Sequence, residues 1–186
     1  MVEKGLNKFF WGFIFIMLGF RIQGFDIFPD IIGYILFAVG FKDLNSSSDY
    51  FKVASKYNIV MIVVSIFSIY EMPTHTEGIH FGSLGILSFI VGIASLVISL
   101  LVVYNLFMGI HEIAHRQERY ELAEDSLKKW KQFLILQIAV WVVLLLIFIP
   151  ILAIILVFAF FIASIIITIS ILSFLKRCSR ELSELS

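Results

Sequence analysis

The chain has 186 residues, of which 60% are hydrophobic and only 15% are charged, and its formal net charge is zero. This composition and the strongly positive mean hydropathy exclude an ordinary soluble domain. A chain without excess basic charge also lacks the electrostatic signature of a nucleic-acid partner. The single cysteine, Cys178, excludes an internal disulfide framework. These observations indicate an integral membrane protein whose first partner is the lipid bilayer.

Six apolar stretches predict an all-α membrane bundle of six spans, arranged as three antiparallel hairpins. A stretch of about 20 apolar residues matches a hydrocarbon layer of about 30 Å, because an α-helix rises about 1.5 Å per residue. The second stretch is short, so a re-entrant segment that does not fully cross stays open as an alternative. The predicted spans are approximately 6–23, 29–44, 53–72, 81–110, 130–149 and 151–175.

Glycines seven residues apart mark one face of each of the first two spans. Gly12 and Gly19 lie in the first span, and Gly33 and Gly40 lie in the second. Small residues let helix backbones approach closely in lipid, where packing replaces the hydrophobic driving force. The first two spans are therefore predicted to form a tight antiparallel hairpin.

The turn between these two spans carries three ionisable residues, Arg21, Asp26 and Asp30. Ionisable residues at the edge of membrane spans can mark a site for an ion or a ligand. A solvated rim, in which Asp26 or Asp30 neutralises Arg21, is the simpler interpretation and is favoured here. The three residues lie near the predicted outer interface and not at the midplane of the bilayer.

Small residues in the fourth span recur at spacings of three and four, which places them on one seam of a helix. Such a seam is typical of close helix–helix contact in a membrane, within one chain or in a homo-oligomer. A substrate channel is the less favoured interpretation. The residues of this seam are Gly85, Ser88, Gly92, Ser95 and Ser99.

Beyond the fourth span the helical pattern continues, but the sequence becomes charged. Glu112 precedes Arg116 by four residues, an order that stabilises a solvated helix. Residues 110–131 are predicted to form a cytoplasmic helical hairpin that projects from the bilayer and re-enters at the interfacial residue Trp130. This charged hairpin is the expected docking surface for a partner.

The distribution of basic residues predicts the orientation. If every stretch crosses, all fourteen Lys and Arg residues except Arg21 fall on one side. Basic loops stay in the cytoplasm, so both termini are predicted to be cytoplasmic. The same rule favours a tight turn at Pro150, because a single long crossing would leave the basic C-terminal segment outside.

The segment His111–His115 reads His-Glu-Ile-Ala-His and matches the signature of zinc metalloproteases. Two histidines four residues apart on a helix can share a zinc ion, while the intervening Glu112 acts as general base. A catalytic zinc needs a third protein ligand, and a tail carboxylate such as Glu181 is on the predicted correct side.

Zinc-dependent proteolysis at the cytoplasmic face is thus the enzymatic alternative, with His111, His115 and Glu181 as ligands. No histidine follows His115, and Arg116 gives Glu112 an ordinary structural partner. The favoured prediction therefore has no catalytic residue, no metal and no cofactor.

Residues 20–34, Phe-Arg-Ile-Gln-Gly-Phe-Asp-Ile-Phe-Pro-Asp-Ile-Ile-Gly-Tyr, resemble the signature of a group of small bacterial multi-pass membrane proteins of unknown function. Residues 109–114, followed by 121–123, are similar to a cytoplasmic helix of the same group. The resemblance covers most of the chain and implies a bacterial inner or plasma membrane protein without an established activity. It also counts against zinc, because the helix is shared whether or not its histidines are present.

Taken with the resemblance, the sequence favours a non-enzymatic protein that binds or regulates a membrane or cytoplasmic partner. Another membrane protein or a second copy of this chain is the expected partner within the bilayer. A transport accessory is the second non-enzymatic interpretation, although an ion-coupled transporter normally needs a charged residue at midplane, and none is evident.

Overall fold

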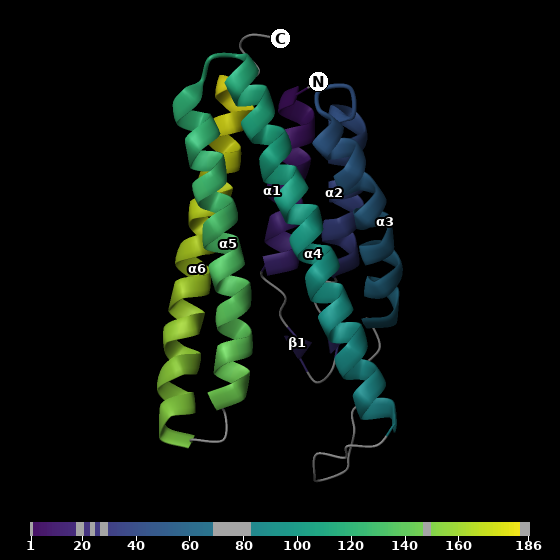
Figure 1. Ribbon diagram of the computed structural model, residues 1–186, viewed down its shortest axis with the longest axis vertical. Helices are drawn as coiled ribbons and strands as arrows, with labels where there is room; N and C mark the ends of the chain where they lie inside the picture. Colours follow the sequence, from purple (N-terminus) through teal and green to yellow (C-terminus); the bar gives the residue numbers. More distant parts are fainter. Residues whose placement is uncertain are drawn as a thin grey trace.

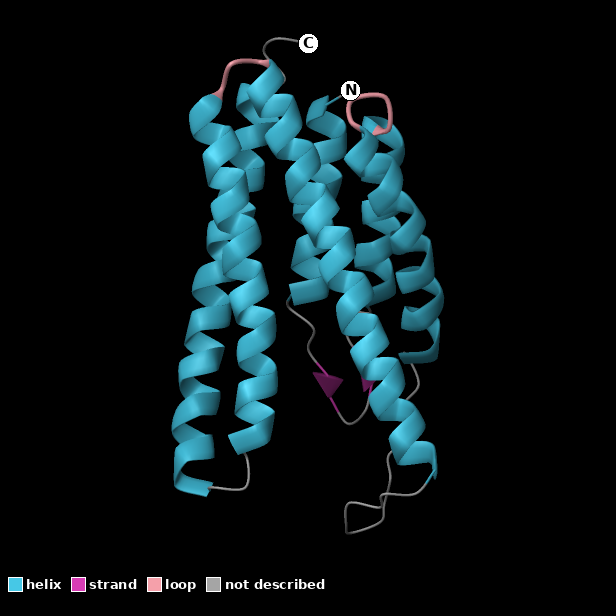
Figure 2. Cartoon of the chain, viewed as in Figure 1, coloured by secondary structure: helices cyan, strands magenta, loops and turns pink. Residues whose placement is uncertain are grey.

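The computed structural model describes residues 2–17, 21–22, 25–26, 30–68, 83–146 and 150–182. Across these residues the protein is all-α apart from one short strand pair, and its helices run alternately up and down the long axis (Figures 1 and 2). The helices are α1 (Val2–Met17), α2 (Asp30–Leu44), α3 (Asp49–Ser68), α4 (Ser83–Arg116), α5 (Tyr120–Leu146) and α6 (Pro150–Glu181). The strands are β1 (Arg21–Ile22) and β2 (Phe25–Asp26), which pair antiparallel.

The helix boundaries follow from local chemistry. Ser48 caps α3, because its Oγ accepts a hydrogen bond from the backbone N–H of Tyr50 at 3.2 Å. At the start of the same helix, Asp49 accepts a hydrogen bond from Lys52 Nζ at 2.6 Å, and this bond with its positive charge lowers the pKa of Asp49. Pro150 opens α6, a position where its missing N–H is not needed. The predicted turn before the last span falls on residues 147–149, which lie outside the described residues.

The turn between α4 and α5 has the geometry of a Schellman motif. The backbone N–H of Arg119 bonds to the carbonyl of Ala114 at 2.9 Å, and that of Glu118 bonds to His115 at 3.1 Å. Glu118 has a φ of 59°, the left-handed conformation that glycine normally supplies at this position. The turn is thus tightly closed, at a conformational cost carried by Glu118.

Each helix packs against its neighbours in sequence, and α6 also packs against α1, so the six helices close into a ring. Phenylalanine rings fill its interior. Phe13 on α1 reaches Phe107 on α4 and Phe133 on α5, with ring centroids 6.1 and 6.4 Å apart. The fully buried phenylalanines are Phe9, Phe13, Phe37, Phe41, Phe51 and Phe107, with Phe133 only 2% exposed.

Glycine makes the α1–α2 contact unusually close. A Cβ atom added to Gly33 would lie 2.8 Å from the carbonyl oxygen of Gly12, and one added to Gly40 would lie 3.0 Å from that of Gly5. The predicted hairpin glycines Gly12, Gly33 and Gly40 thus lie in the contact. Gly5 was not predicted to lie in this contact, but it lies seven residues before Gly12 and extends the same face. Gly19 is outside the described residues.

The seam predicted on α4 is packed only in part. Ser99 is buried and is hydrogen-bonded to Tyr34 on α2. Ser95 bonds to the carbonyl of Val91 in its own helix at 2.7 Å, and a Cβ added to Gly92 would meet no other atom within 4 Å. The middle of the seam therefore faces open space within this chain; Gly85 and Ser88 lie on α4, but their surroundings are outside the described side chains.

Apolar side chains cover the outside of the bundle. Exposed isoleucine, valine or phenylalanine occurs on α2 to α6, and Phe158 on α6 is 67% exposed. Among the described residues, Ile90–Arg116 and Ile154–Glu181 are long and apolar enough to cross a membrane. For the remaining predicted spans, crossing stays a prediction, although a helix occupies the place of each one.

Residues 110–131, which the sequence predicts to be a cytoplasmic helical hairpin that projects from the bilayer, form a helix–turn–helix made of the end of α4 and the start of α5. The apolar face of this hairpin is buried, and its projection from the bilayer stays a prediction. Ile110 and Leu122 have almost no exposed surface and belong to the same buried cluster as Leu175 and Cys178 on α6. The hairpin is thus part of the bundle, because its apolar positions continue the core of the two long helices.

Candidate functional site

Most of the described polar interactions lie at one end of the bundle. This end contains the start of α1, the end of α6, and the loops that join α2 to α3 and α4 to α5 (Figure 2). Every predicted cytoplasmic basic segment is at this end, because the helices alternate in direction (Figure 1). It is named the basic end below.

Glu112 and Arg116 fasten the α2–α3 loop to α4. Glu112 accepts hydrogen bonds from Ser48 Oγ, at 2.5 Å, and from the guanidinium of Arg116. Arg116 in turn donates to the carbonyl oxygen of Ser47 at 3.0 Å. The predicted Glu112–Arg116 pair is therefore formed, and Ser48 is an added partner that comes from 64 residues away.

The two histidines of the zinc-like signature pack against the start of α5. His111 Nδ1 lies 3.0 Å from the carbonyl oxygen of Ala123, which requires the proton to be on Nδ1. The ring of His115 contacts that of Tyr120 edge-on, with centroids 5.3 Å apart. The ring centroids of the two histidines are 6.1 Å apart. Both side chains thus contribute to closing the α4–α5 hairpin.

The remaining members of the zinc hypothesis are engaged elsewhere. Glu181 accepts a hydrogen bond from Arg177 on its own helix at 2.7 Å. Throughout the described part of the chain, no three His, Cys, Asp or Glu side chains are grouped so that they could hold a metal ion. The geometry of Glu112 is that of a structural ion pair.

Arg177 joins α5 to α6. Its guanidinium lies 3.1 Å from Glu121 and 3.4 Å from Asp125, both on α5, and 2.7 Å from Glu181. Asp125 also pairs with Lys128 at 3.2 Å. One arginine thus neutralises carboxylates of two helices where α5 and α6 approach the basic end.

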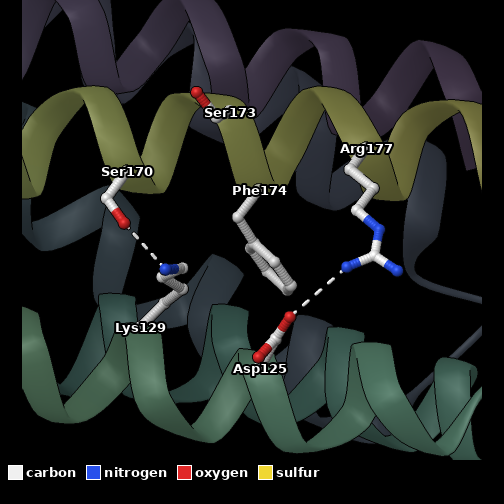
Figure 3. A pocket seen from close by; sticks show the side chains of 6 residues that line it. All are labelled: Asp125, Lys129, Ser170, Ser173, Phe174 and Arg177. Atoms are coloured by element: carbon white, nitrogen blue, oxygen red, sulfur yellow. Dashed lines mark hydrogen bonds and ion pairs between the residues drawn. The ribbon is translucent and has the colours of Figure 1, made fainter.

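A pocket of about 240 Å³ opens beside this cluster. Figure 3 shows that the ring of Phe174 lies between two polar pairs, Arg177 with Asp125 and Lys129 with Ser170. Lys129 Nζ donates to Ser170 Oγ at 2.7 Å. The pocket is therefore an opening with hydroxyl, carboxylate and ammonium groups on its walls, suited to a polar or ionic ligand.

A second polar group lies inside the bundle, between α2, α3 and α4. The Nδ2 atom of Asn58 donates to the carbonyl oxygen of Tyr34 at 2.7 Å, and the Tyr34 hydroxyl bonds to Ser99. The Oδ1 atom of Asn58 is buried without a hydrogen-bond partner among the described residues. These bonds link three helices across an apolar core, a common use of polar groups in membrane bundles.

The predicted polar rim is only partly described. Arg21 and Asp26 are directly opposite one another in the β1–β2 pair, and Asp30 is in the first turn of α2. The backbone thus brings the first two residues together, as the favoured interpretation of a neutralised rim requires. Their side chains, and residues 23–24 and 27–29 of the turn, are outside the described part.

The pocket at Lys129 and Arg177 was not predicted. In the sequence, the basic character of Lys129 and Arg177 indicates only the orientation of the chain. A usable signal was present: Ser170, Ser173 and Arg177 follow a helical spacing of three and four and lie on one face of α6. The sequence gives no indication, however, that α5 supplies the opposite wall.

Comparisons with protein-family models, with curated proteins and with solved structures find nothing that matches this chain.

Proposed function

We propose that this chain is a six-span membrane protein that has its basic end in the cytoplasm and acts without catalysis, by binding or regulating a partner at that end. Three features support the membrane placement: helices of alternating direction, basic segments gathered at one end, and apolar side chains on the exterior. In lipid, an exterior of this kind is stable because the surrounding acyl chains are as apolar as the side chains.

The observation that carries the proposed binding role is Tyr120, a large aromatic side chain that is 58% exposed at the first residue of α5, directly after the turn from α4. Charged residues surround it in sequence, with Glu118 and Arg119 before it and Glu121 after it. An exposed aromatic residue inside a charged surface is typical of a protein-binding hot spot.

The turn that presents Tyr120 is fixed from several sides. The His111 ring bonds to Ala123, and the Ser126 hydroxyl donates to the carbonyl of Phe107 at 2.6 Å. Arg177 holds Glu121 from α6. A surface that is rigid before binding loses little conformational entropy when a partner docks, which favours affinity.

The interior favours binding over conduction. The space that helices enclose at the basic end is occupied by phenylalanine rings, and a pathway for an ion or a polar solute needs polar groups or water instead. This interior therefore supports a role as an accessory or regulator better than a role in which the chain itself forms the pathway for a transported substrate.

A photo-crosslinking residue at position 119 tests the proposal in intact cells. We expect a discrete adduct with one partner, and we expect Tyr120→Ala to reduce its yield at least about fivefold, since loss of a hot-spot residue costs more than about 1 kcal/mol. The control is a crosslinker at Ile162, which is on the exposed apolar face of α6.

Two results would contradict the proposal. One is a set of adducts at position 119 that Tyr120→Ala leaves unchanged. The other is zinc at one ion per chain that is lost in His111→Ala, which would favour the hydrolytic alternative instead.

A further inference from the structure

We propose that the seam between α5 and α6 is a specific binding site for one phospholipid of the leaflet at the basic end, with its phosphate at Lys129 and one acyl chain in an apolar groove below. This inference rests on the membrane placement proposed above, but not on the partner at Tyr120.

The groove lies between the middle parts of α5 and α6 and has a volume of about 420 Å³. This volume lies within the range of small-molecule sites, roughly 300–1,000 Å³. The groove has room because small alanine side chains line it on both helices, at Ala139, Ala159 and Ala163. Larger apolar side chains such as Leu136 and Leu156 form its walls. Because its lining is almost entirely hydrocarbon, the groove suits an acyl chain.

The groove and the polar pocket belong to one continuous seam. On α6, Leu156, Phe160, Ala163 and Ile167 line the groove, and the same steps of four and three lead to Ser170, Phe174 and Arg177 in the pocket. On α5, Lys129 of the pocket is followed at a spacing of seven by Leu136 of the groove. Residues at these spacings share one helix face. The polar pocket is therefore directly above the apolar groove, as a lipid headgroup is above its chain.

The groove is about as long as one leaflet is thick, and it lies on both sides of the middle of the predicted span 151–175, so a chain that enters from the polar pocket reaches past the midplane. Leu156 and Ile167 mark its extent on α6, and the helix between them covers about 16 Å at about 1.5 Å per residue. Half of a hydrocarbon layer of about 30 Å is about 15 Å.

Charge identifies the headgroup. Arg177 is balanced by Glu121, Asp125 and Glu181, and Asp125 also holds Lys128. The described partner of Lys129 is different in kind, because it is the neutral hydroxyl of Ser170 and not a carboxylate.

An ammonium group has three donors, so Lys129 retains donors and an unbalanced positive charge. A phosphodiester supplies both the negative charge and the acceptor oxygens, and the Ser170 hydroxyl can donate a second hydrogen bond to it. The chemistry favours a phospholipid over an uncharged diacylglycerol with the same chains.

Native mass spectrometry of the purified full chain in detergent tests the site by titration with phosphatidylglycerol or with diacylglycerol. We expect one tightly retained phosphatidylglycerol per chain and no comparable retention of diacylglycerol. Lys129→Ala should raise the Kd for phosphatidylglycerol about tenfold, because hydrogen bonds to charged groups contribute about 1.5 kcal/mol or more. Lys129→Arg should restore most of the binding.

Matched controls separate this site from general lipid adhesion. Lys131→Ala removes an exposed lysine two positions away on another face of α5 and should leave the Kd unchanged. Ala163→Trp fills the groove and should abolish retention, whereas Ile162→Trp, on the exposed face beside it, should not. Thermal unfolding of each variant shows whether the fold persists.

Retention of diacylglycerol equal to that of phosphatidylglycerol, or equal effects of Lys129→Ala and Lys131→Ala, would overturn the lipid site. Those results would leave the crosslink from position 119 and membrane insertion unaffected. Loss of insertion or of the crosslink in the unmodified chain would instead overturn the proposed function.

Discussion

At the scale of single residues, the basic end of this protein depends on side chains that meet across helices. Arg177 and Glu112 each connect elements that are distant in sequence, the first at a separation of 56 residues and the second at 64. Both pairs are partly exposed, so each contributes modestly to stability. Their main effect is to fix the geometry of the surface around Tyr120.

Glu118 gives a residue-scale prediction. Its left-handed φ costs an L-residue roughly 1–2 kcal/mol, and glycine avoids this cost. Glu118→Gly should therefore raise the free energy of unfolding in detergent by about 1 kcal/mol. Gln117→Gly, at a neighbouring position without a positive φ, should lower it by about 0.5–1 kcal/mol. Equal effects of the two changes in reversible thermal or denaturant unfolding would contradict this account of the turn.

At the scale of helices, small residues have two different roles in the structure. At the α1–α2 contact they permit backbone approach, and a side chain at Gly33 would collide with the carbonyl oxygen of Gly12. On α4, by contrast, Gly92 faces open space in this chain. The same residue type at similar spacing thus marks a filled contact in one hairpin and an unoccupied surface in the other.

This contrast predicts opposite effects of the same substitution. Gly33→Ala should lower the free energy of unfolding by about 1–3 kcal/mol, because overpacking against backbone atoms cannot relax by a side-chain shift. Gly92→Ala should be neutral or should raise it by up to about 1 kcal/mol, since alanine favours a helix over glycine. Denaturant unfolding in matched micelles measures both. A large loss in Gly92→Ala would show that its surface is covered, as a homo-oligomer through this seam requires.

At the scale of the whole molecule, the alternation of six helices brings the basic segments together. The ring of contacts from α1 round to α6 fixes which ends are adjacent, and the phenylalanine cluster holds the ring closed at the basic end. Which helices cross the bilayer can be measured in lipid by labelling residues from each side of the membrane.

Cysteine labelling tests the proposed topology. Native Cys178 is 0% exposed, so it should give little background with a maleimide that does not cross membranes. A cysteine placed at Ser46 or at Arg119 should be labelled only after permeabilisation, and one placed at Thr76, in the predicted outer loop, should be labelled in intact cells. Labelling of Ser46 and Arg119 from opposite sides would contradict the six-span arrangement.

Much of the architecture is local information that a single sequence contains. Apolar length, basic flanks and Pro150 indicate where each helix occurs, because hydropathy and backbone preference act over a few neighbouring residues. The glycine spacing likewise predicts the α1–α2 face. Periodicity identifies the face of a helix that is buried, but it does not identify the helix on which that face packs.

For this reason, only the tertiary structure decided the contacts of the basic end. It gave Glu112 the partner Ser48, embedded the 110–131 hairpin in the bundle, and aligned the pocket at Lys129 with the groove below it. Each of these depends on packing between helices that are far apart in the chain. Such contacts are set by the shape of the whole bundle, whereas the helices themselves are set by the residues they contain.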